Sequence, residues 1–190
     1  MNERPDLPLF DWGAREDATE HRYRRLRWRC AIGACCLSLL ALTVIDPPPP
    51  RLVWNASASA PLGLFEVATD ARLARGDMVI AWAPQGAREL AARRHYLPRN
   101  VPLVKRIAGV AGDWVCATGE VLSVNGKRVA IRLKRDAAGR TMPWWRGCKM
   151  LGRDRFLLLM DAPASFDGRY FGPTARSDVV GRATPIWTWS

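Results

Sequence analysis

Serine and lysine side chains give this chain its clearest prospect of covalent chemistry. A serine hydroxyl attacks a carbonyl carbon when a nearby base removes its proton, and a neutral lysine amine is one such base. The commoner hydrolase arrangements fit poorly, since the sequence has no Gly-x-Ser-x-Gly, His-Glu-x-x-His or phosphate-loop motif. Its two histidines, His21 and His95, each stand beside an arginine. The residues that favour a serine–lysine pair are Ser57, Ser59 and Lys105.

Lys105 interrupts a stretch of largely apolar residues at 101–107. If this strand is buried, its apolar surroundings disfavour the charged ammonium and lower the pKa of Lys105, so that the amine can act as a base. Simple alternation explains the same pattern with an outward-facing, solvated lysine on an amphipathic strand. The residues by themselves leave both interpretations open.

The two serines lie in a run of small residues at 55–63, with the sequence NASASAPLG. Composition alone favours a flexible linker there, because Ser, Ala, Pro and Gly are typical of loops and tethers. A loop that presents a nucleophile is the alternative. The pattern of residues suggests a serine–lysine pair and does not establish one.

An uncharged apolar run at 30–45 predicts that the chain is attached to a membrane. Five arginines crowd into residues 22–29 just before this run, and no basic cluster follows it directly. The positive-inside rule therefore predicts a cytoplasmic basic tail at 1–29, a single-pass transmembrane anchor in the inner membrane at 30–46, and a periplasmic remainder. Residues 1–20 show no clear periodicity, which favours a loose tail.

The residues after the anchor favour an uncleaved membrane protein. Four consecutive prolines predict a stiff, extended spacer at 47–53. A cleaved signal peptide is the alternative, because residues 56–58 and 58–60 both have the small-x-small form of a cleavage site. Both sites lie well beyond the apolar run, whereas cleavage normally follows such a run closely.

The net charge of +11 could attract nucleic acid, but the basic residues beyond the anchor are scattered singly. This distribution argues against a nucleic-acid-binding face. The spacing of Cys116 and Cys148 fits no zinc motif, and we expect neither a metal nor a cofactor. In an oxidising compartment these two cysteines could form a disulfide, and two buried free thiols are the alternative.

Short apolar runs separated by glycine and proline turns dominate the chain from residue 52 onward. Asn125-Gly126 is a strong hairpin signal, and only residues 87–94 favour a helix. Residues 134–150 indicate an inserted loop. The predicted fold is therefore mainly β, an antiparallel sandwich or barrel-like domain at 54–190. The expected strands cover residues 78–82, 103–110, 114–117, 121–124, 128–131, 156–160 and 179–189.

Several motifs, in order, resemble the serine–lysine peptidases of the signal peptidase I superfamily, in the form of the conjugal-transfer peptidases of the TraF type. Residues 55–65 (NASASAPLGLF) are similar to the nucleophile motif, and residues 102–113 (PLVKRIAGVAGD) are similar to the lysine box. Residues 165–172 (SFDGRYFG) resemble the last box, which is normally Asp-Ser-Arg followed by Gly. Weaker matches are residues 76–80, 124–127 and 180–183.

The resemblance implies a role for each matching residue. It makes Ser59 the nucleophile and Lys105 the general base, and it places the Ser57 hydroxyl beside the oxyanion. It implies that Asp167 and Arg169 support the lysine side of the site as an ion pair. The remaining candidate, Ser165, would orient the lysine amine.

The sequence departs from the housekeeping signal peptidases in ways that favour the conjugal-transfer branch. Ala60 follows the nucleophile where methionine is usual, and Gly168 replaces the serine of the last box. The resemblance implies an endopeptidase acting on preproteins or pilin precursors, with hydrolysis and acyl transfer to another amine both open. The competing hypothesis is a non-enzymatic, membrane-anchored pilus or secretion component that uses Trp-rich contact surfaces; the chain has nine tryptophans.

Overall fold

The computed structural model describes residues 12–45 and 49–189, in two units that are treated separately. The first unit consists of α1 (Trp12–Ile45), a helix of 34 residues. Within it, the 25 residues His21–Ile45 form a helix long and apolar enough to cross a membrane. About 20 residues suffice for this purpose. The expectation of one N-terminal apolar helix is confirmed, and its orientation stays a prediction.

Helix α1 begins earlier than the sequence suggested. We expected a loose tail over residues 1–20, and this is wrong from Trp12 onward, because residues 14–18 (AREDA) include the good helix formers Ala, Arg and Glu. The predicted boundary between tail and anchor, at residues 29 and 30, lies inside this continuous helix. Residues 1–11 of the tail and residues 46–48, where the predicted spacer starts, lie outside the described residues.

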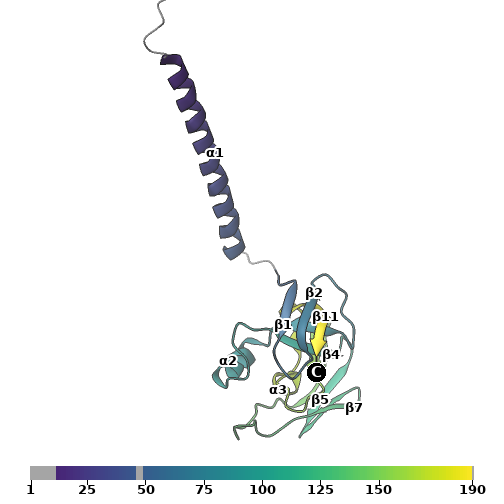
Figure 1. Ribbon diagram of the computed structural model, residues 1–190. Coiled ribbons are helices and arrows are strands. Elements are labelled where there is room, and N and C mark those ends of the chain that lie inside the picture. Colours follow the sequence, from purple (N-terminus) through teal and green to yellow (C-terminus); the bar gives the residue numbers. More distant parts are fainter. Residues whose placement is uncertain (1–11, 46–48, 190) are drawn as a thin grey trace, which may run out of the picture. The chain divides into compact units, whose positions relative to one another are not determined.

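The second unit contains two sheets, and every strand pair in them is antiparallel. The larger has the order β1-β2-β11-β3-β4-β9-β10 and the smaller β7-β6-β5-β8. Figure 1 shows β1, β2 and β11 side by side in the larger sheet. The strands are β1 (Leu52–Asn55), β2 (Leu62–Ala68), β3 (Met78–Ala81), β4 (Leu103–Gly109), β5 (Trp114–Thr118), β6 (Val121–Val124), β7 (Lys127–Ile131), β8 (Gly147–Met150), β9 (Arg155–Leu159), β10 (Thr174–Ala175) and β11 (Val179–Trp189).

The mainly β, antiparallel prediction is confirmed, with two corrections. Strand β1 starts inside the predicted spacer, since Leu52 already pairs with Glu66 of β2. The segment at 134–150, predicted as an inserted loop, ends in β8, whose Cys148 lies opposite Cys116 of β5. The four residues of β8 are all exposed, so the strand has no alternation of buried apolar and exposed polar residues by which it could be predicted.

Three short helices or turns complete the unit: α2 (Gln85–Arg93), α3 (Gly168–Phe171) and the 3₁₀ turn η1 (Arg176–Asp178). The predicted helix at 87–94 corresponds to α2, whereas α3 and η1 were not expected. Both α3 and η1 are only about one turn long, which is too short to show a helical period in the sequence.

The apolar core explains why β9 is an unbroken hydrophobic run. Leu157 and Leu159 pack against the inner face of the smaller sheet, beside Val115 and Leu122. Residues on the opposite face of β9, such as Leu158, join a cluster with other strands of the larger sheet. A strand covered on both faces has no polar alternation. Strand β4, which pairs with β9, is buried on both faces at Val104 and Lys105, although Arg106 is exposed.

Candidate active site

Strand β4 carries Lys105 into the interior of the domain. Alternation along the strand places Lys105 on the same face as Ile107, with Val79 of β3 directly opposite in the register. The residue is 2% exposed. The outward-facing interpretation of Lys105 is therefore wrong, because the sheet is covered on both sides and the neighbouring Val104 is buried as well.

The lysine amine lies between two serine hydroxyls from distant parts of the chain. Its Nζ donates to the Oγ of Ser59 and to the Oγ of Ser165, each at 2.9 Å. Ser59 belongs to the loop between β1 and β2, and Ser165 follows β9. The structure thus brings together three of the residues that the sequence comparison with serine–lysine peptidases implied.

Burial controls the protonation of this amine. Desolvation lowers the pKa of Lys105 from 10.5 to about 8, while the charge of Asp167 raises the pKa and that of Arg169 lowers it. Removing an ammonium from water disfavours its charged form, and the two neighbouring charges act in opposite directions. A substantial fraction of Lys105 is therefore neutral near pH 8, and a neutral amine can take a proton from a hydroxyl at 2.9 Å.

Asp167 and Arg169 form a buried ion pair beneath this site. Arg169 Nε lies 2.8 Å from Asp167 Oδ1, and their side chains are 2% and 0% exposed. The carboxylate also accepts the backbone N–H of Met160, and Arg169 donates to the carbonyl oxygen of Pro163 at 3.0 Å. The ion pair therefore holds Met160 and Pro163, which precede Ser165 in the chain. The N–H of Ser165 itself donates to the carbonyl oxygen of Ala162.

Ser57 lies beside the proposed nucleophile. Its Oγ is 3.0 Å from the Oγ of Ser59, and the Ser59 backbone N–H points to the Ser57 Oγ at 3.4 Å. A hydroxyl and a backbone N–H this close together are the kinds of donor that stabilise an oxyanion. The oxyanion role of Ser57 remains a prediction.

The serine–lysine pair opens into a pocket of about 420 Å³. Its walls are mostly apolar, which is usual for a ligand-binding pocket. They come from segments far apart in the chain, including the loop at 133–142 and the residues after α2. Lining side chains include Leu103, Tyr96, Leu133, Met142, Phe166 and Tyr170.

One wall of the pocket is held by Asp136, which the sequence did not single out. Its carboxylate accepts hydrogen bonds from the Tyr96 hydroxyl and from the backbone and side chain of Arg140. The bond from Tyr96, and then those from Arg140, hold the pKa of Asp136 well below its ordinary value. The charged carboxylate therefore joins the loop at 133–142 to the segment after α2. No short motif could have indicated this, since the partners are 40 residues apart.

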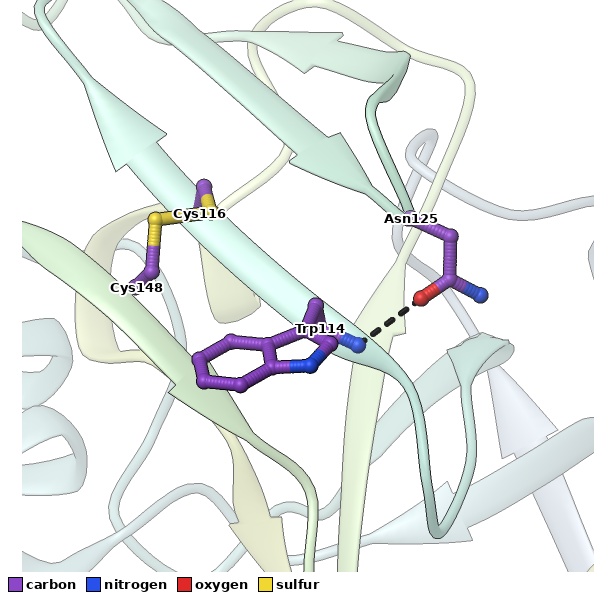
Figure 2. Close-up of a disulfide and its surroundings, with 4 residues drawn as sticks. All are labelled: Trp114, Cys116, Asn125 and Cys148. Atoms are coloured by element: carbon purple, nitrogen blue, oxygen red, sulfur yellow. Dashed lines mark hydrogen bonds between the residues drawn. A yellow bond between two sulfur atoms is a disulfide. The ribbon is translucent and has the colours of Figure 1, made fainter.

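The remaining predicted pair lies away from the pocket, on the smaller sheet. Cys116 and Cys148 form a disulfide that links β5 to β8, as Figure 2 shows. Because β8 follows the loop that lines the pocket, the bond fixes one end of that loop. Within residues 21–45 and 49–189, no group of three or more His, Cys, Asp or Glu side chains is arranged to hold a metal ion.

Comparison with known proteins gives a family for the chain. Residues 25–189 match the model of a family described as signal peptidase, peptidase S26. A plasmid transfer protein TraF from Escherichia coli is 32% identical over 179 residues, covering 88% of this chain and 99% of that protein. A probable conjugal transfer protein TraF from Sinorhizobium fredii is 33% identical over 147 residues, covering 72% and 77%.

A solved structure is also similar in part. A signal peptidase I from Enterococcus faecalis V583 aligns with 60% of this chain and 98% of its own, at 19% identity and a TM-score of 0.36.

Proposed function

Because the chain belongs to the signal peptidase family, peptidase S26, we propose that it is a serine endopeptidase with Ser59 as nucleophile and Lys105 as general base. The observation that carries the proposal is the 2.9 Å separation of Lys105 Nζ from Ser59 Oγ in a buried setting that lowers the lysine pKa to about 8. A nucleophile and a base within hydrogen-bond reach, at the edge of a pocket, satisfy the geometric requirement for acyl transfer.

In the first half of the reaction, the neutral amine of Lys105 accepts the Ser59 proton as the hydroxyl oxygen attacks a peptide carbonyl. The developing negative charge on the carbonyl oxygen is met by the Ser59 N–H and the Ser57 hydroxyl. Losing one such donor typically costs about 3 kcal/mol of transition-state stabilisation. When the tetrahedral intermediate collapses, the C–N bond breaks and the Lys105 ammonium gives its proton to the departing amine.

In the second half, a nucleophile resolves the acyl-enzyme. Lys105, neutral again, takes a proton from water, and hydrolysis releases a carboxylic acid. If an amine of the same polypeptide reaches the ester first, the product is a cyclic peptide, and no water is consumed. Ser165, which lies 2.9 Å from Lys105 Nζ, orients the amine toward Ser59 in both halves. No metal or cofactor takes part in this sequence.

The substrate we propose is a preprotein or pilin precursor used in conjugative transfer, cleaved after a small-x-small sequence. Support comes from the TraF relatives, whose names place them in plasmid transfer. Helix α1 would anchor the chain in the inner membrane with the arginines at 22–29 in the cytoplasm and the second unit in the periplasm. The dyad would then work where precursors emerge from the membrane.

The test is precursor processing by the full-length protein. A pilin precursor and several exported preproteins are co-expressed with wild type, Ser59→Ala, Lys105→Ala and the matched control Ser123→Ala, a serine on β6 outside the pocket. We expect processing by wild type and the control only. Mass spectrometry of the product distinguishes cyclisation, in which the product lacks one water, from hydrolysis. Normal processing by Ser59→Ala would refute the proposal.

An exposed tryptophan cluster favours a second candidate, a non-enzymatic anchored component of a pilus or secretion apparatus. Trp54, Trp187 and Trp189 lie 5.3–6.4 Å apart between ring centroids and are 52%, 64% and 44% exposed. Large exposed aromatic groups are common at protein contacts. Pilus assembly that survives Ser59→Ala but fails in Trp187→Ala would favour this candidate.

A further inference from the structure

One asparagine side chain organises the loop that carries Ser57 and Ser59. Asn55 is the last residue of β1 and is 7% exposed. Its amide nitrogen lies 3.0, 3.2 and 2.9 Å from the carbonyl oxygens of Ser57, Ala60 and Pro61. Its amide oxygen accepts the backbone N–H of Ser57 at 3.1 Å. A single side chain therefore contacts four backbone groups of the loop at 56–61.

The loop has few other anchors: Ala60 is buried in the core, and Lys105 donates to the Ser59 hydroxyl. Ala56 and Ala58 are exposed, so the side chains on either side of Ser57 contribute little packing. One backbone hydrogen bond, from Ala60 N–H to Ser57 O at 3.3 Å, also closes the turn. The position of Ser59 relative to Lys105 thus depends strongly on the Asn55 amide.

We propose that Asn55 is a positioning residue for the nucleophile, an inference that rests on the proposed serine peptidase function. Asn55 holds the backbone on both sides of Ser59 and forms no hydrogen bond with Ser59 itself, whose N–H donates to the Ser57 Oγ at 3.4 Å. Only an amide serves, because the site needs N–H donors for the carbonyl oxygens and an acceptor for the Ser57 N–H. A carboxylate at this position would face those carbonyl oxygens with no proton to donate.

Two substitutions test this assignment in the full-length protein. Asn55→Ala removes all four contacts, and Asn55→Asp keeps the acceptor but loses the donors. For each we expect kcat to fall about 100-fold, the effect typical of a misplacement near 1 Å. KM should change little, because other segments build most of the pocket. The pH at half-maximal rate should also stay constant, since the surroundings of Lys105 are intact.

A second asparagine provides the matched control. Asn125 accepts the backbone N–H of Trp114 and donates to Asp113, each at 2.8 Å, and Figure 2 shows the first of these bonds. It lies in the β6–β7 turn, away from the pocket, with a φ of 51° that glycine adopts without strain. Asn125→Gly should lower the unfolding midpoint, as the Asn55 variants do, while kcat stays at the wild-type value.

Wild-type kcat in both Asn55 variants, measured below their unfolding temperatures, would overturn the positioning role. An equal loss of kcat in Asn125→Gly would overturn it too, by showing a general effect of destabilisation. Hydrogen exchange provides a readout that needs no activity. If the wild type cleaves nothing, the proposed function fails, yet Asn55→Ala should still speed exchange at residues 57–60 relative to wild type. Unchanged exchange there would refute the positioning role by itself.

Discussion

Replacing Lys105 by methionine should stabilise the domain at neutral pH. The pKa of Lys105 is 10.5 in the unfolded chain and about 8 in the folded domain, because burial disfavours the ammonium. This difference corresponds to about 3 kcal/mol. The unfolded chain binds the proton more tightly, so the folded state bears this cost in full below pH 8 and loses it as the pH rises toward 10.5. Methionine has a similar length and carries no charge.

The size of the effect follows from the two pKa values. At pH 7 the variant should gain up to about 3 kcal/mol, and at pH 10 less than about 1 kcal/mol. Loss of the hydrogen bonds to Ser59 and Ser165 reduces the gain at both pH values by about 1 kcal/mol for each bond. The difference between the two pH values is therefore the sharper quantity, about 2 kcal/mol.

The measurement is urea unfolding of the full-length protein in detergent micelles, followed by tryptophan fluorescence at pH 7 and pH 10. Lys127→Met is the matched control, since Lys127 is exposed at the start of β7. Its free energy of unfolding should differ little from wild type at both pH values. If the stability of Lys105→Met relative to wild type were the same at pH 7 and pH 10, the argument that burial lowers the pKa of Lys105 would be refuted.

Three further outcomes follow from the same contacts. The rate of peptide cleavage should rise about tenfold per pH unit below an inflection near pH 8, where Lys105 loses its proton; a flat profile between pH 6 and 9 would contradict this. Arg169→Met should lower the free energy of unfolding in urea by about 3–5 kcal/mol, because it leaves the buried charge of Asp167 uncompensated. It should also move the inflection of the rate to higher pH, because Arg169 lowers the pKa of Lys105. An unchanged inflection would show that the ion pair does not act on the lysine. Cys116→Ser with Cys148→Ser should cost about 4 kcal/mol, because the disulfide closes a loop with a sequence separation of 32. Reductant should destabilise wild type equally and leave the variant unaffected.

Much of the β architecture could be predicted because its strands are short apolar runs between turn residues. The hairpin at Asn125-Gly126 is an example, since Asn125 adopts the positive φ that this turn requires. Strand β8 could not be predicted, because it is exposed along its whole length and depends on pairing with β5. The start of α1 was missed for another reason: its first turns have helix-forming residues but no apolar period.

The site was harder to predict than the sheets because its residues acquire their roles from distant partners. The alternation in β4 fits both an exposed and a buried Lys105, and its contacts with Ser59 and Ser165, 46 and 60 residues away in the chain, show that it is buried. Ser59 looks like part of a linker until β1 and β2 pair on either side of it. The residue types suggested the pair and the resemblance to serine–lysine peptidases strengthened it, but neither assigned a role to Asn55 or Asp136.

The buried ion pair explains how the domain keeps a carboxylate close to Lys105, which must be neutral to act as the proposed base. Asp167 alone would raise the pKa of Lys105 and favour the inactive ammonium. Arg169 opposes this, and desolvation by burial is the largest influence on the pKa of the lysine. The carboxylate is nevertheless needed, because it accepts the Met160 N–H and holds the segment that leads to Ser165. The pair therefore supplies rigid hydrogen bonding beside Lys105, while the charge of Arg169 partly offsets the effect of Asp167 on the pKa of the lysine.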